Sequence, residues 1–97
     1  MQVARVVGNV VASVKEPRLT GTTLLLVEDA ATDGASLGRP AYVAVDLVGA
    51  GETELVVVVT GSPAARAIGV EGTPVDSAVI AIIDRVRSAG RTSFQKS

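Results

Sequence analysis

The chain has 97 residues, enough for one domain, and contains neither cysteine nor histidine. The missing cysteines exclude a disulfide framework and a thiol nucleophile, and the missing histidines remove the commonest general base and the commonest zinc ligand. The net charge of −1 implies no bulk attraction to nucleic acid or to an anionic membrane. Hydrophobic residues make up 47% of the chain but aromatic residues only 2%, which predicts an aliphatic core and a surplus of apolar surface that self-association would bury.

The first half of the chain predicts two strands. β-Branched residues dominate Val3–Val14, and Gly8–Asn9 inside this run predicts a bulge or a sharp bend. Pro17, which cannot donate a hydrogen bond to a neighbouring strand, marks the end of the first strand. Thr22–Glu28 is predicted as the second strand, and Asp29–Pro40, with its aspartates and glycines, as a loop.

Residues 41–60 predict two more strands around a glycine turn. Val43–Val48 alternates between two faces, which is typical of a half-buried strand, whereas Leu55–Val59 is apolar throughout and should be covered on both faces. Gly49 and Gly51 resemble the start of a dinucleotide-binding fingerprint, but Glu54 stands at the position of its third glycine, and a strand follows instead of a helix. We therefore interpret this segment as a tight turn that uses the freedom of glycine at positive φ.

A short helix and a final apolar segment follow. Pro63 suits the first turn of a helix over Ala64–Ile68, with Ser62 as its N-cap and a glycine stop after it. Residues 71–74 are predicted to form a loop. Val75–Val86 is apolar at nearly every position, so periodicity alone cannot separate a buried strand from a buried helix; its isoleucines and valines favour a strand. From Arg87 the chain becomes polar and is expected to be loosely ordered.

Five short strands, glycine bends and one small helix predict an all-β domain with a small α contribution, a five-stranded β-barrel of the OB type. We place this single domain at residues 1–88 and a flexible, polar and basic tail at residues 89–97. The charges are uneven, because residues 1–84 hold ten acidic and five basic side chains, whereas residues 85–97 hold four basic and no acidic ones. The tail is either a solvated extension or a short basic arm that meets an acidic partner surface.

Four segments follow one another in a specific order along the chain: RVVGNVVASVKEPRLTGTTLLLVE, AVDLVGAG, GSPAAR and PVDSAVIAIID. Their order resembles that of the bacterial microcompartment vertex proteins, the EutN/CcmL family. The resemblance covers Met1 to about Val86, and this chain departs from the family pattern at Thr53, where glycine is usual, and at Pro63, where serine is usual.

The resemblance implies a structural protein: an OB-type barrel that assembles as a homopentamer and caps the vertices of a polyhedral shell tiled by hexameric shell proteins. It also implies that Gly49, Ala50 and Gly51 form a structural turn. It further implies a pore-edge segment near the five-fold axis, made of Gly61, Ser62, Ala65 and Arg66. The alternative for this segment is an ordinary capped helix turn with a surface salt bridge.

No catalytic, cofactor-binding or metal-binding residue is predicted. Nothing in the sequence pairs Asp46, Asp76 and Asp84 for acid–base or metal chemistry, so hydrogen bonding within the fold is expected for Asp76 and Asp84, and an interface or backbone contact for Asp46. The alternative function is an OB-type nucleic-acid-binding module, but Tyr42 and Phe94 are the only aromatic residues that could stack on bases. Neither a signal peptide nor a membrane span is visible, so a cytoplasmic location is the simplest expectation.

Overall fold

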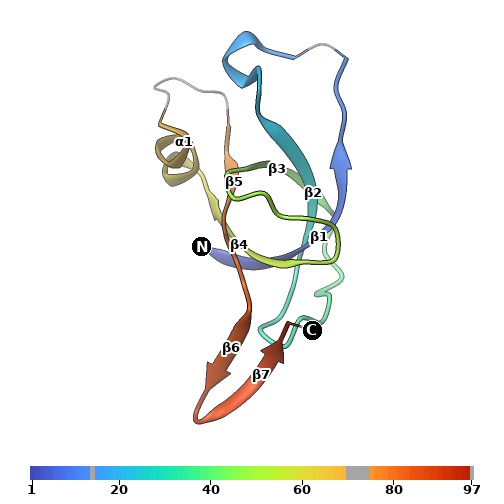
Figure 1. Cartoon of the computed structure of the whole chain (residues 1–97), viewed down its shortest axis with the longest axis vertical. Coiled ribbons are helices and arrows are strands. Elements are labelled where there is room, and N and C mark those ends of the chain that lie inside the picture. Colours follow the sequence, from blue (N-terminus) through green and yellow to red (C-terminus); the bar gives the residue numbers. More distant parts are fainter. Residues whose placement is uncertain (14, 70–74, 97) are drawn as a thin grey trace.

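The computed structural model of the protein describes residues 1–13, 15–69 and 75–96. Its strands are short and its helices are confined to two segments (Figure 1). In chain order the elements are β1 (Gln2–Val10), the 3-10 helix η1 (Pro17–Leu19), β2 (Thr23–Asp29), β3 (Tyr42–Asp46), β4 (Leu55–Thr60), α1 (Ser62–Ile68), β5 (Ser77–Ile82), β6 (Arg85–Ser88) and β7 (Arg91–Gln95).

Five of these strands close into a barrel in the order β1-β2-β3-β5-β4, with β4 pairing back to β1. All neighbours are antiparallel except β3 and β5, which run parallel over the two pairs Val45–Ala78 and Asp46–Val79. The prediction of a five-stranded barrel with one short helix is confirmed.

Strand β1 bends so that it can pair with two neighbours. Its register against β2 shifts between Val6 and Gly8, which is the bulge that the glycine in this strand predicted. Arg5, just before the shift, pairs with Glu28 on β2 and with Leu55 on β4. The bulge therefore lies next to the part of β1 that pairs with both β2 and β4.

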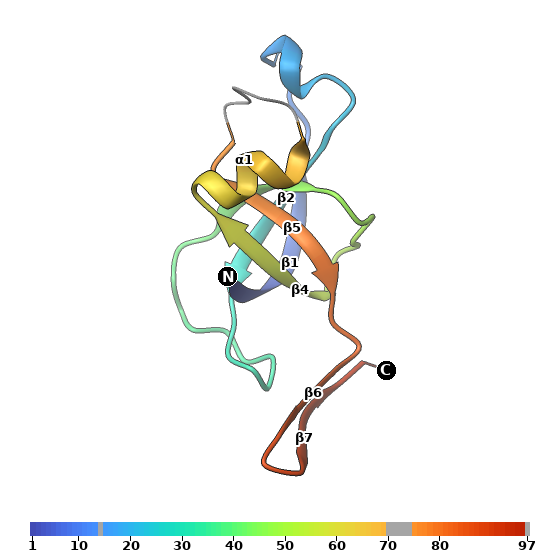
Figure 2. The same ribbon diagram turned by 90° about the vertical axis from the view of Figure 1, so that its left-hand side faces the viewer.

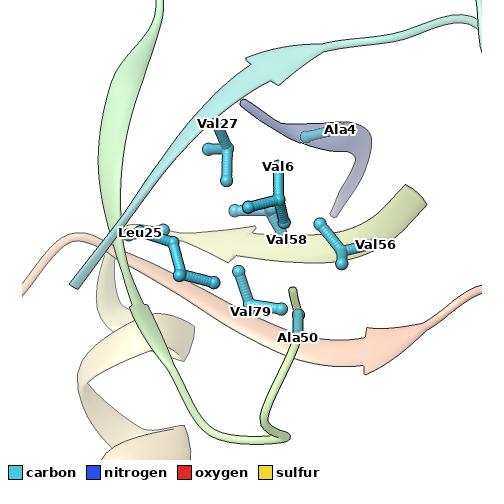
Figure 3. Close-up of a cluster of buried hydrophobic side chains, with 9 residues drawn as sticks. Ala4, Val6, Leu25, Val27, Ala50, Val56, Val58 and Val79 are labelled. Carbon is cyan, nitrogen blue, oxygen red and sulfur yellow. The ribbon is translucent and has the colours of Figure 1, made fainter. Parts of the chain in front are cut away.

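The barrel interior is aliphatic, as the composition predicted. Small and β-branched side chains from all five strands point toward one another, and Ala50 reaches them from the turn between β3 and β4 (Figure 3). A second, smaller cluster lies under α1, where Ala64 is fully buried against Val59 and Ala78. The residues of the main cluster are Ala4, Val6, Leu25, Val27, Ala44, Ala50, Val56, Val58 and Val79.

Strand β4 contributes to both clusters. Val56 and Val58 face the barrel interior, and Val59 faces the cluster beneath α1. Figure 2 shows α1 lying across β4 and β5 on the outside of the barrel. The prediction that both faces of this strand are covered is confirmed.

Several boundaries differ from the predictions, most of them by one or two residues. The helix begins at Ser62, and its N-cap is Gly61, which enters the helix at φ 70° without a side-chain cap hydrogen bond. Its end at Gly69 is as predicted, in the left-handed conformation that suits glycine. The first strand ends at Val10, and the predicted strand Val75–Val86 is divided into β5 and the start of β6. The predicted loop at residues 71–74 lies outside the described residues.

The C-terminal segment forms a β-hairpin instead of a loosely ordered tail. Strands β6 and β7 pair with Val86 opposite Phe94, and the two residues between the strands, Ala89 and Gly90, have φ values of 52° and 76°. Positive φ at both central positions gives the twist that a two-residue hairpin turn needs. The hairpin projects from the barrel beyond the end of β5 in both views (Figures 1 and 2).

Candidate functional site

The predicted structural turn lies between β3 and β4. Asp46, the last residue of β3, accepts hydrogen bonds at its Oδ1 from three backbone amides of the turn, at 3.0, 3.0 and 3.3 Å. The donors are the amides of Val48, Gly49 and Ala50. The turn is thus tied to the strand that precedes it, and Asp46 is satisfied by backbone, one of its two expected environments.

The three predicted turn residues have different roles. Gly49 has φ 79°, a conformation that other residues rarely adopt. Ala50 is only 8% exposed and points into the barrel beside Val79 (Figure 3). Gly51 has ordinary φ, and a Cβ there would lie 3.5 Å from the nearest atom, on Glu54, so its own chain does not demand glycine. This turn positions an alanine in the core.

Thr53, which ends the turn, has φ 73° although it carries a β-branched side chain. Its amide donates to the Val6 carbonyl at 2.8 Å and its carbonyl accepts from the Arg5 guanidinium at 2.6 Å, so the backbone is held in place. We expect Thr53→Gly to raise the free energy of unfolding by about 0.5–1 kcal/mol, because relief of the left-handed strain exceeds the added chain entropy. The midpoint of urea unfolding measures this change in stability. Thr53→Ala keeps most of the strain, so equal gains from both substitutions would contradict this explanation.

The predicted pore-edge residues lie together on α1 and the turn that leads into it. Gly61, Ser62 and Arg66 are exposed, whereas Ala65 is half-buried. The Gly61 amide donates to the Asp76 carbonyl at 2.8 Å, which fixes the start of α1 against the start of β5. Within the described residues Arg66 forms no ion pair, so the alternative of a surface salt bridge at this residue finds no support there.

A polar cluster that the sequence analysis did not identify lies at the start of β1. Gln2 donates from its Nε2 to Asp29 Oδ1 at 2.8 Å and to the Tyr42 hydroxyl at 2.6 Å, and that hydroxyl donates to the same Oδ1 at 2.9 Å. Arg39 reaches the other Asp29 oxygen at 3.3 Å. These residues come from three strands and a loop, so no local sequence pattern announces their meeting.

Burial raises the pKa of Tyr42 from 10.0 to about 12; the hydrogen bond from Gln2 opposes this shift and Asp29 adds to it. Because Tyr42 is the only tyrosine and the chain lacks tryptophan, the ultraviolet absorbance of tyrosinate reports this residue alone. We expect a titration midpoint near 12, and a stability contribution that is complete below pH 10 and lost as the pH rises toward 12. Asp29→Asn should leave most of the shift, because burial dominates it. A wild-type midpoint near 10 would contradict the burial.

The hairpin is attached to the barrel by a second polar group. Lys96 Nζ and Glu54 Oε2 form an ion pair at 2.5 Å, and the Gly51 amide donates to the other Glu54 oxygen at 2.7 Å. The hydrogen bond from Lys96 lowers the pKa of the Glu54 carboxyl, and the same bond raises the pKa of Lys96. Ser93 adds a hydrogen bond from its Oγ to the Thr32 carbonyl at 3.2 Å.

The carboxylates considered for chemistry do not converge. The described residues include no group of three side chains able to hold a metal ion. Asp76 and Asp84 are both exposed and contribute backbone carbonyls, to the amides of Gly61 and Lys96, while neither carboxylate forms a hydrogen bond or an ion pair with a described residue. The hydrogen bonding expected of these two residues therefore comes from their backbone.

Two further observations bear on the alternatives. No helix in the described part of the chain is long and apolar enough to cross a membrane. Tyr42 lies on β3 with its hydroxyl engaged by Gln2 and Asp29, and Phe94 lies on the hairpin against Gly34. The two aromatic side chains are thus both half-buried and on separate elements, which does not favour the stacking platform of a nucleic-acid-binding barrel.

Comparison with known proteins gives a consistent result. The sequence model described as "Ethanolamine utilisation protein EutN/carboxysome" matches residues 1–84. The carboxysome shell vertex protein CcmL of Synechocystis sp. is 45% identical over 96 residues, which cover 99% of this chain and 95% of that protein.

Solved structures agree with the sequence comparison. An ethanolamine utilization protein, EutN, superposes with a TM-score of 0.92 at 40% identity, over the whole of both chains. The GrpN pentameric microcompartment shell protein of Rhodospirillum rubrum superposes with a TM-score of 0.80 at 37% identity, over 92% of this chain and all of that one.

Proposed function

Because this chain belongs to the EutN/CcmL family, we propose that it is a structural shell protein that forms a homopentamer at the vertices of a bacterial microcompartment. The family's characterised members are shell components and not enzymes. The observation that carries the proposal is the likeness of nearly the whole chain to shell vertex proteins and to a microcompartment shell protein described as pentameric. Hexameric shell proteins are its proposed partners, and the cytoplasm its proposed location.

The proposed geometry has a physical basis. A layer built only of six-fold units stays flat, and five-fold units introduce the curvature that lets a polyhedral shell close. A ring of five requires a heterologous interface, in which two different patches of neighbouring subunits meet and the rotation closes. The chain needs no reactive group for this role.

The surface of the single chain supports assembly. Val43 on β3 is 45% exposed, and Leu47 and Val48 in the following turn are 41% and 39% exposed. Val7 on the outside of β1 is 40% exposed. Large aliphatic side chains exposed on different elements are what a ring interface would cover.

We also propose that the segment of Gly61, Ser62, Ala65 and Arg66 edges the five-fold axis. Its support is that α1 lies outside the barrel and presents Ser62 and Arg66 to solvent (Figure 2). An Arg66→Cys variant would test it: five axial thiols should crosslink between subunits under mild oxidation, whereas uncrosslinked rings would place this segment away from the axis.

The mass of the native protein in solution tests the proposed function. Light scattering is expected to give a five-fold multiple of the 9.8 kDa chain mass. Mixing the protein with a hexameric shell protein from the same source should then convert flat sheets or open tubes into closed particles, visible by electron microscopy. A stable monomer, or sheets that remain open, would contradict the proposal.

A further inference from the structure

The hairpin β6–β7 stands apart from the barrel and is mostly exposed. The molecule measures 45 × 23 × 22 Å, and in both views the hairpin extends along the long direction past the end of β5 (Figures 1 and 2). Among its strand residues only Val86 and Phe94 are half-buried; the rest are exposed. A two-stranded hairpin is at best marginally stable on its own in water, so this one gains from being covered.

Its attachment to its own barrel is confined to one end. Ser93 bonds to the Thr32 carbonyl, Phe94 lies against Gly34, and Lys96 pairs with Glu54. The tip, from Ser88 to Arg91, makes no side-chain hydrogen bond within the part of the chain that the structure describes. The hairpin is therefore held at its base and presented outward at its tip.

The hairpin is also strongly basic. Arg85 bonds to Gln95 on the facing strand and Lys96 to Glu54. The guanidinium groups of Arg87 and Arg91, one on each strand near the tip, form neither an ion pair nor a hydrogen bond with any described residue. Two free guanidinium groups on long aliphatic stems suit a surface that is apolar with a carboxylate at its rim.

Such a surface is present on this chain. A groove beside β3 is lined by apolar side chains, by Ser77 and by one carboxylate, that of Asp76, which is exposed and unpaired among the described residues. The apolar side chains are those of Leu19, Leu24, Val43, Val45 and Val75.

A chain cannot fill its own groove with its own hairpin. Asp76 immediately precedes β5 and the hairpin follows it, so the six residues of β5, roughly 20 Å of extended strand, separate them. The hairpin and the groove are thus different patches at opposite ends of one strand. A heterologous ring interface requires two such different patches. The barrel's excess of acidic residues adds to the attraction.

From these observations we infer that the hairpin tip of one subunit docks in the apolar groove of the next subunit, with Arg87 or Arg91 facing Asp76. The inference rests on the proposed ring. It explains why the C-terminal segment forms a defined hairpin, and it makes part of the ring interface electrostatic. Higher salt should therefore weaken the ring.

Charge reversal and its rescue test the inference. The variant Arg87→Glu/Arg91→Glu should raise the subunit concentration at which the ring half-dissociates by about tenfold, because it removes the charge pair with Asp76 and places glutamates opposite that carboxylate. The variant Asp76→Arg should do the same, and combining the three substitutions should recover most of the affinity. The matched control is Arg87→Lys/Arg91→Lys, which keeps both charges. Light scattering across a dilution series, with circular dichroism to verify folding, provides the measurement.

The outcomes separate this inference from the proposed function. If the wild-type protein is pentameric and the folded double glutamate variant dissociates at the wild-type concentration, the hairpin contact is wrong and the shell function stands. If the double glutamate variant weakens the ring and adding Asp76→Arg does not restore it, the hairpin does not pair with this groove. A wild-type monomer would overturn the ring and the contact together.

Discussion

Replacing Ile82 with aspartate should lower the free energy of unfolding by about 3 kcal/mol. Ile82 ends β5, pairs with Val56 of β4, and packs against the barrel core. Aspartate would lose the aliphatic contacts and place a carboxylate without a partner at the rim of the core. Because stability of a small domain is only about 5–15 kcal/mol, much of its margin would be lost. Urea unfolding followed by circular dichroism at a fixed subunit concentration measures the change.

Two controls isolate the cause of the Ile82→Asp effect. Ile82→Val removes one methylene and should cost about 1 kcal/mol. Val11→Asp places the same charge at a residue that is 90% exposed, so its effect should stay within about 0.5 kcal/mol. Equal midpoints for Ile82→Asp and Val11→Asp would mean that Ile82 does not contribute to the core.

The barrel could be predicted because each strand carries its own pattern. The alternation over Val43–Val48 and the unbroken run Leu55–Val59 correspond to β3 and β4, and the glycine in β1 marks its bulge. These signals depend on residues close together in the sequence. The closure of the barrel then follows from burying aliphatic side chains that lie on one face of each strand.

The hairpin could not be predicted in the same way. Its turn is made by Ala89 and Gly90, and alanine at positive φ is not a recognised turn signal, unlike Asn-Gly. Its one apolar cross-strand pair is Val86 and Phe94. In the sequence these two residues are separated by polar residues that are typical of a solvated tail. Composition therefore suggested disorder, whereas pairing between the strands decides the structure.

Local rules also misplaced the helix cap and overlooked the polar cluster. Serine is the stronger N-cap residue, but Gly61 reaches φ 70° and ties its amide to the Asp76 carbonyl, so Ser62 becomes the first helical residue. The contact of Gln2 with Asp29 and Tyr42 depends on the register of three strands. Neither feature can be read without the tertiary structure.

Replacing Asp46 with alanine should lower the free energy of unfolding by about 2 kcal/mol. The substitution removes the acceptor shared by the amides of Val48, Gly49 and Ala50. Water can satisfy the two amides whose residues are exposed, but Ala50 is buried, so its amide would remain unpaired or leave the core. Urea unfolding at a fixed subunit concentration again gives the change.

The consequence of Asp46→Ala should extend from stability to assembly. The same turn carries Leu47 and Val48, two of the exposed apolar residues that a neighbouring subunit would cover, so loosening it should also raise the concentration at which rings dissociate. Asp46→Asn retains a carbonyl oxygen at the same position and should lose less than half as much stability as alanine. If asparagine and alanine are equally damaging, the negative charge and not the shared acceptor holds the turn. If the Asp46→Ala variant unfolds at the wild-type urea midpoint, the three hydrogen bonds do not order the turn in solution.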